Sequence, residues 1–140
     1  MRLVLDTDVV VAAFRSPTGA SSALLDYALD GKCVLLVSAP LAFEYEAVVK
    51  RHEQLVAMSI SLEQADRLIR TVVALCEPVF KAYSWRPQLR DPDDEMILEA
   101  AVNGGADMLV TFNQRDFGSA PAAFGIECLL PRYALERIRS

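Results

Sequence analysis

Histidine and closely spaced cysteines are almost absent from this 140-residue sequence, and their scarcity excludes several kinds of site. His52 is the only histidine, so a histidine-rich metal site is excluded, and we interpret this residue as a surface residue. Three cysteines, Cys33, Cys76 and Cys128, are widely spaced among aliphatic residues and form no CxxC motif. We therefore expect buried thiols in a reducing compartment rather than zinc ligands.

Long apolar runs are also missing. No stretch approaches the roughly 20 apolar residues that a membrane-spanning helix needs. The apolar segment at the amino terminus is interrupted by Asp6 and Asp8, which is unlike a secretory signal peptide. We therefore expect a cytoplasmic protein that does not associate with membranes.

Basic residues are fewer than acidic ones: the sequence has 14 lysines and arginines and 19 acidic residues, which gives a net charge of -5. This balance argues against binding of nucleic acid through a broad basic face. It does not exclude nucleic acid as a substrate, since carboxylates that hold divalent cations make a protein acidic while the bound metals supply local positive charge.

Apolar segments alternate with segments of helical periodicity along the whole chain, and 53% of the residues are hydrophobic. We expect a single domain over residues 1–140, of the α/β class, in a three-layer α/β/α sandwich with a central, mostly parallel sheet of about five strands. Strands are predicted at 1–5, 33–37, 77–80, 107–111 and 126–130. Helices are predicted at 9–14, 20–29, from residue 40, and at 53–58, 61–75, 91–103 and 131–139, with an irregular connection at 83–90. Pro78 predicts an edge position for its strand.

Four acidic residues follow strand ends or begin a helix on the same expected side of the sheet: Asp6, Glu44, Asp94 and Asp116. The carboxyl ends of parallel strands meet at one edge, where ligands bind in open α/β sheets. Carboxylates gathered there repel one another unless cations neutralise them, and hard oxygen ligands suit Mg²⁺ or Mn²⁺. A pair of such metals activates water for attack on a phosphodiester. The pattern therefore predicts phosphodiester hydrolysis.

Each of these acids also has a simple structural interpretation. Asp94 could be an ordinary first-turn acid of a helix that Asp91 caps. Glu44 could be a solvated helix residue, and Asp116 could be a turn residue. Asp6 is harder to explain in this way, because an acid that ends a buried strand needs a partner or a function.

Several other polar residues at strand ends could support the site by holding waters or by capping turns: Thr7, Asp8, Ser38, Thr111 and Asn113. Capping is the simpler interpretation of Ser38 and Asn113. Asp8 is either a neighbour of the metal site or the N-cap of the following helix.

Four segments, residues 4–14, 37–48, 91–101 and 109–117, together resemble the PIN-domain nucleases in their order and spacing, over nearly the entire chain. The resemblance is to the VapC-like branch, which comprises the toxins of bacterial and archaeal toxin-antitoxin pairs. It implies a PIN-like fold and an endoribonuclease that depends on Mg²⁺ or Mn²⁺ and cleaves single-stranded RNA. It also implies a homodimer held inactive by a cognate antitoxin. The family's four metal-binding acids map onto Asp6, Glu44, Asp94 and Asp116.

The sequence departs from this family at Asp8, where PIN domains typically have Asn. The change adds negative charge beside the site or exchanges one N-cap for another. Asp93 adjoins Asp94 closely enough that the two could exchange roles, although the three-residue step to Ile97 favours Asp94. Three arginines, Arg15, Arg90 and Arg115, are expected in loops near the same edge, and Arg115 is the candidate for contact with the substrate.

Two rival interpretations start from the same residues. A haloacid-dehalogenase-like phosphatase would use Asp6 as a nucleophile and Asp8 as a general acid, but would leave Glu44 and Asp116 without a role. A catalytically inert PIN-like module would serve only in RNA binding or dimerisation.

Overall fold

The computed structural model describes residues 1–80 and 89–140, so most of the irregular connection expected at 83–90 lies outside the described residues. The strands are β1 (Arg2–Leu5), β2 (Val34–Ser38), β3 (Glu77–Val79), β4 (Met108–Val110) and β5 (Glu127–Leu129). The helices are α1 (Thr7–Arg15), α2 (Ala20–Leu29), α3 (Ala39–Val49), α4 (His52–Met58), α5 (Leu62–Leu75), α6 (Pro92–Asn103), α7 (Gln114–Phe117), α8 (Ala120–Ala123) and α9 (Pro131–Arg139).

The five strands form a parallel sheet in the order β3-β2-β1-β4-β5. β1 is central, because Leu3 pairs with Leu35 of β2 on one side and with Met108 of β4 on the other. All three of these residues are buried, as expected for strands covered on both faces. The parallel five-stranded sheet is confirmed, and so is the edge position of β3 that Pro78 predicts.

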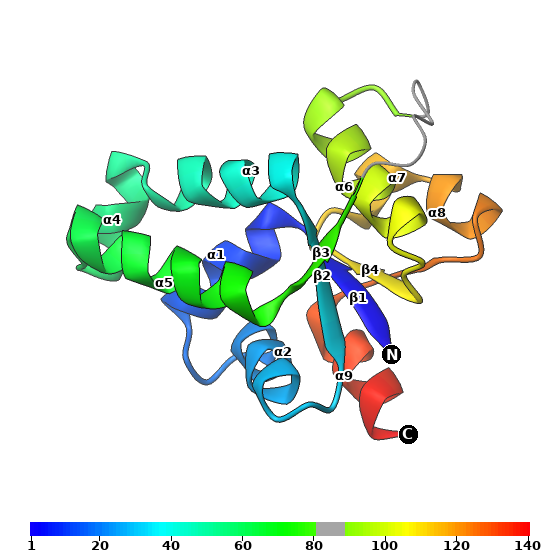
Figure 1. Ribbon diagram of the computed structural model, residues 1–140, viewed down its shortest axis with the longest axis horizontal. Helices are drawn as coiled ribbons and strands as arrows, with labels where there is room; N and C mark the ends of the chain where they lie inside the picture. Colours follow the sequence, from blue (N-terminus) through cyan, green and yellow to red (C-terminus); the bar gives the residue numbers. More distant parts are fainter. Residues whose placement is uncertain (81–88) are drawn as a thin grey trace.

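Helices cover both faces of the sheet (Figure 1). α6 packs on β1, β2 and β4, with α7 beside it. α2 and α9 pack against each other, and α9 contacts β4 from the opposite face. Right-handed crossovers explain this division, because the chain moves from β1 to β3 in one direction and then returns across the sheet to β4 and β5. The result is the expected three-layer α/β/α sandwich.

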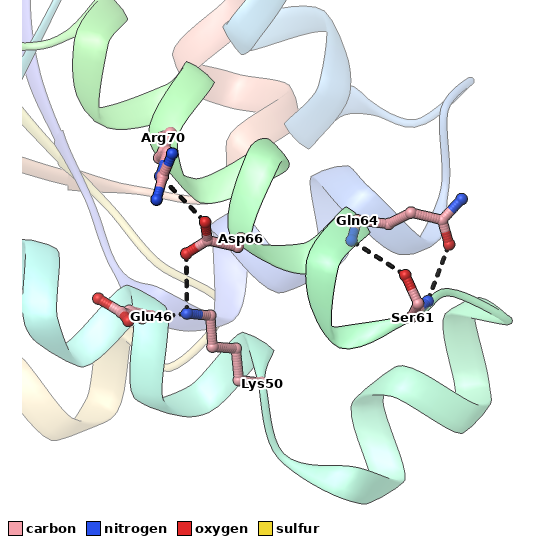
Figure 2. Close-up of polar contacts among 6 residues, drawn as sticks. All are labelled: Glu46, Lys50, Ser61, Gln64, Asp66 and Arg70. Carbon is pink, nitrogen blue, oxygen red and sulfur yellow. Dashed lines mark hydrogen bonds and ion pairs between the residues drawn. The ribbon is translucent and has the colours of Figure 1, made fainter.

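The helices α3, α4 and α5 extend to one side of the sheet (Figure 1). The Ser61 hydroxyl accepts from the Gln64 N–H at 3.1 Å, and the Gln64 side chain accepts from the Ser61 N–H at 2.8 Å (Figure 2). This reciprocal capping box, which the sequence predicts, fixes the start of α5.

A set of ion pairs joins α3 to α5 (Figure 2). The ammonium of Lys50, the C-cap residue of α3, lies 2.8 Å from the Glu46 carboxylate on α3 and 2.9 Å from the Asp66 carboxylate on α5. Asp66 in turn pairs with Arg70 at 3.0 Å. Of these contacts, the one between Lys50 and Asp66 links the C-terminal end of α3 to α5.

The junction of α6 with the sheet is tightly packed at Gly104, which follows the last residue of α6. A Cβ atom at this position would lie 2.8 Å from Val79 Cγ2 and 2.9 Å from Leu36 Cδ1. The Gly104 carbonyl also accepts a hydrogen bond from the Arg2 guanidinium at 2.9 Å. Glycine therefore permits the close approach of α6 to β2 and β3.

Within the described ranges, no helix combines the length and the apolar composition that crossing a bilayer requires.

Candidate active site

Asp6 lies just beyond β1 and is only 7% exposed. Its N–H donates to the Val110 carbonyl at 2.8 Å, which continues the pairing of β1 with β4. One carboxylate oxygen accepts from the Thr7 N–H at 2.7 Å and the other from the Thr111 hydroxyl at 2.6 Å. Burial raises the pKa of Asp6, while these two hydrogen bonds to its charged form oppose the rise. The carboxylate is therefore held in one orientation.

Asp8 points to the loop after β4. One of its carboxylate oxygens accepts from the Phe112 N–H at 3.2 Å and from the Asn113 amide at 2.9 Å. Its other oxygen is buried and has no hydrogen-bond partner among the described residues. Burial, followed by the nearby Asp6 charge, raises the pKa of Asp8 to about 7. The N-cap of α1 is Asp6, so the N-cap alternative for Asp8 is wrong.

A cavity of about 650 Å³ opens beside these two acids and is called the acidic cavity below. Its walls come from the ends of β1 and β4 and from α1, α3, α4 and α6. It carries six carboxylates: Asp6, Asp8, Glu44, Asp91, Asp93 and Asp94.

Glu44 of α3 and Asp94 of α6 face this cavity from two sides. Burial, and then the Asp93 charge, raises the pKa of Glu44, while Arg51 opposes the rise. Burial, and then the charges of neighbouring acids, raises the pKa of Asp94 to about 6. Three of the four expected metal ligands thus line one cavity, and the Asp6 charge contributes to the raised pKa values of both Glu44 and Asp94.

Asp116, the fourth, lies on α7 and is exposed. Its charge contributes to the raised pKa values of Asp6 and Asp94. Asp116 and Asp94 line a neighbouring cavity of about 710 Å³, together with Arg90 and Arg115. Asp94 belongs to both cavities and therefore connects Asp116 and Arg115 with the acidic cavity.

Comparison with known proteins identifies the family. The family model for the PIN domain matches residues 2–115. This chain belongs to the PIN domain family. A solved structure, that of VapBC2 from Rickettsia felis bound to a DNA fragment from their promoter, is similar in fold, with a TM-score of 0.63 and 17% sequence identity. The match covers 91% of this chain and 97% of that one. A search of curated proteins found no match.

PIN domains are generally nucleases that use divalent metal ions, so we asked whether the residues fit one. Within residues 1–80 and 89–140, no three Asp, Glu, His or Cys side chains are grouped as a ready-made metal site. The donor chemistry does fit, because Asp8 Oδ1 and the Thr7 hydroxyl oxygen are buried beside the carboxylates without partners among the described residues. Oxygen donors of this kind suit Mg²⁺ or Mn²⁺. Asp94 is half-buried and Asp116 exposed, and both lie close enough to Asp6 for their charges to interact with it.

Arg51 and Gln54 belong to the acidic cavity of this PIN domain although the sequence does not predict them there. The buried Gln54 Oε1 has no hydrogen-bond partner in the part of the chain that the structure describes. Both residues come from the start of α4, which contacts α1 only after the chain has turned back from α3. No local signal in the sequence distinguishes Arg51 from the basic residue before it.

Ser38 caps α3 as expected, accepting from the Leu41 N–H at 3.3 Å, and it lines a separate cavity and not the acidic one. Two sequence expectations need correction. Asn113 precedes α7 without a side-chain cap and instead donates to Asp8. Arg15 belongs to the last turn of α1 rather than to a loop, and it lines the acidic cavity.

The family match disfavours the phosphatase alternative, which would also leave Glu44 and Asp116 without a role.

Proposed function

We propose that this PIN domain is an endoribonuclease that depends on Mg²⁺ or Mn²⁺ and hydrolyses phosphodiester bonds of single-stranded RNA. The observation that carries the proposal is the gathering of strand-end acids around one cavity, in a chain whose family generally uses metal ions for nucleolysis. The 140 residues act as one domain, and we place the protein in the cytoplasm.

The four acids Asp6, Glu44, Asp94 and Asp116 would hold the metal. When bound, the metal supplies a water of lowered pKa and stabilises the charge that develops on the phosphate oxygens. Thr111 positions Asp6 through its 2.6 Å hydrogen bond. Asn113 positions Asp8.

Other polar residues have supporting roles. Thr7 and Asp93 contribute oxygen atoms near the cavity, and Ser38 supports the site only by starting α3, which carries Glu44. Arg115 would contact an RNA phosphate beside Asp116. Arg51 would do the same in the acidic cavity, where it is the cation that opposes the rise in the pKa of Glu44.

Matched variants on α3 test the proposal. Glu44→Gln removes an acid that lines the cavity, whereas Glu46→Gln removes one that is ion-paired with Lys50 outside it. We expect Glu44→Gln, like Asp94→Asn, to slow cleavage of single-stranded RNA in Mn²⁺ on the order of 100-fold or more, because metals supply several kcal/mol of transition-state stabilisation. Glu46→Gln should cleave like the wild type. Equal activity of all three variants would sink the assignment.

Titration calorimetry separates the enzyme from an inert PIN-like module. Mn²⁺ should bind the wild type and should bind Asp94→Asn more weakly. Absence of binding to the wild type would favour the inert module. Hydrolysis of phosphate monoesters without RNA cleavage would favour the phosphatase.

We further propose that the chain is the toxin of a toxin-antitoxin pair and acts as a homodimer controlled by a cognate antitoxin protein. The similar fold found in the VapBC2 complex supports an antitoxin partner. Expression should arrest growth, and Asp94→Asn should relieve the arrest at equal protein levels. A growth arrest that persists in this variant would contradict the toxin assignment.

A further inference from the structure

A second cavity adjoins the acidic cavity. It encloses about 410 Å³ and is mainly apolar, with walls from α1, the start of α2, the loop after β4 and the start of α9. Ala12, Ser16 and Phe112 line both cavities, so the two are neighbours that share a wall. A ligand bound in the acidic cavity can therefore reach the second one across this wall.

Phe112 presents an aromatic ring at the junction of the two cavities. It is 48% exposed, although it directly follows Thr111, which is completely buried. The Phe112 N–H donates to Asp8, so its backbone is fixed relative to the acids. An exposed ring on a fixed backbone is the kind of surface on which proteins stack bases of single-stranded nucleic acids.

The amino terminus of α2 forms another wall of the second cavity. Gly19 precedes the helix and offers no side-chain cap, and the first turn contains no acid. Ser21 lines the cavity and is only 4% exposed, and its hydroxyl makes no hydrogen bond within residues 1–80 and 89–140. Uncapped N–H groups and an unpartnered hydroxyl are suited to an anion such as phosphate. Arg132 adds a positive charge at the same cavity.

We propose that this second cavity is a nucleotide subsite, which binds the RNA nucleotide next to the bond that is cut. The base stacks on Phe112, and its phosphate lies between the start of α2 and Arg132. This proposal rests on the proposed ribonuclease function and adds the position from which the RNA is held. A ring surface combined with donors and positive charge matches a nucleotide better than it matches an apolar peptide side chain.

A combination of protein and RNA variants tests the subsite. A fluorescent single-stranded RNA of eight nucleotides is prepared intact and with an abasic site at each position in turn. Cleavage in Mn²⁺ and binding by fluorescence anisotropy are measured with the full-length wild type and with Phe112→Ala. The matched control is Phe43→Ala, which removes a ring that is 71% exposed on α3 and lines neither cavity.

We expect one abasic position to weaken RNA binding to the wild type by roughly 5- to 150-fold, the range for loss of one base–aromatic stack. Phe112→Ala should weaken binding of intact RNA by a similar factor and show no further loss with that abasic RNA. Phe43→Ala should behave like the wild type. Phe112→Trp keeps an aromatic face. Unlike Phe112→Ala, it should bind the abasic RNA more weakly than the intact RNA, as the wild type does.

The outcomes separate the two proposals. The subsite proposal is wrong if the wild type cleaves RNA and Phe112→Ala binds and cleaves RNA as well as the wild type does. It is also wrong if the loss of affinity from Phe112→Ala and the loss from the abasic site multiply when the two are combined. The second cavity would then be a candidate site for a protein partner. If the wild type binds RNA with the expected base dependence but does not cleave it, binding of a nucleotide in the second cavity stands, whereas its position beside a cleaved bond and the nuclease proposal fail. Neither binding nor cleavage by the wild type overturns both.

Discussion

At the scale of single residues, the hydrogen bond from Thr111 to Asp6 is the most informative contact of the site. Thr111 is completely buried at the end of β4, and Asp6 is nearly so at the end of β1. A buried carboxylate without donors is costly and tends to take up a proton. This bond therefore helps to keep Asp6 ionised and oriented.

Thr111→Val, which keeps the shape of the side chain, should remove this donor. We expect a loss of about 1–3 kcal/mol in the free energy of unfolding, the cost of leaving a buried acceptor unsatisfied. The pKa of Asp6 should rise further, since the bond to Thr111 lowers it. Denaturant unfolding measures the first effect, and NMR titration of the carboxyl carbon measures the second.

The control is Thr71→Val, at an exposed position of α5 where the hydroxyl bonds only to the Arg67 carbonyl. It should leave the titration of Asp6 unchanged. An unaltered Asp6 titration in Thr111→Val would show that the bond does not determine the ionisation of this acid.

The residues of the site differ in how well sequence predicts them. Asp6 is predictable because an acid at the end of a buried strand is rare without a purpose. The sequence leaves two possible roles for Asp8, because its hydrogen-bond partners, Phe112 and Asn113, lie more than 100 positions away in the chain. Arg51 and Gln54 could not be found, because they reach the cavity only through packing of α4.

At the scale of elements, the close approach of α6 to the sheet depends on Gly104. Gly104→Ala should lower the free energy of unfolding by about 1–3 kcal/mol, as overpacking of a filled interior does. The added Cβ would meet Leu36 and Val79 side chains and the Ala100 carbonyl, all below 3.0 Å. Thermal or denaturant unfolding followed by circular dichroism measures the change.

Gly19→Ala provides the comparison, because its Cβ would approach no atom more closely than the Ser16 hydroxyl oxygen, at 3.2 Å. The backbone there has a φ of -82° and accepts alanine. We expect a smaller loss of stability than at Gly104, because alanine is a weaker N-cap than glycine but its Cβ would meet only the Ser16 residue and not three groups below 3.0 Å. Equal losses at the two glycines would contradict the packing explanation.

Most elements were predictable because their apolar periodicity and their caps agree. The sequence places α2 and α9 at their observed bounds, and the capping box at Ser61 correctly marks the start of α5. Two features were missed. α1 begins at Thr7 rather than Val9, because Asp6, which the sequence predicts as a site residue, is also the N-cap of this helix. α8 has only four residues, too few for periodicity to be visible.

At the scale of the whole molecule, six carboxylates around one cavity give the metal-free protein a pH-dependent stability. The folded-state pKa values of Asp8 and Asp94, about 7 and about 6, lie above the ordinary value of 3.8. The stabilisation of the folded protein that these two raised pKa values provide is fully present below pH 3.8. It is lost as the pH rises toward 6 and 7, because the folded protein then holds the unneutralised charges of Asp8 and Asp94. Metal-free protein should therefore lose stability across this window.

Asp8→Asn should reduce this loss, since asparagine can keep the hydrogen bond from the Phe112 N–H without the charge. We expect the metal-free variant to be more stable than the wild type at pH 8, with the difference disappearing below pH 4. Melting curves in a chelator across this range measure the effect, and Asp30→Asn at the exposed C-cap of α2 is the control. A constant difference at all pH values would exclude charge repulsion as the cause.

The order of the strands has a consequence for synthesis on the ribosome. β1 is made first, yet one of its two neighbours, β4, spans residues 108–110, and Asp116 follows still later. A nascent chain therefore lacks the Thr111 hydroxyl and the Asp116 carboxylate until β4 and α7 have been synthesised. Products terminated before β4 would carry only part of the group of acids, so under the proposed function they would be inactive.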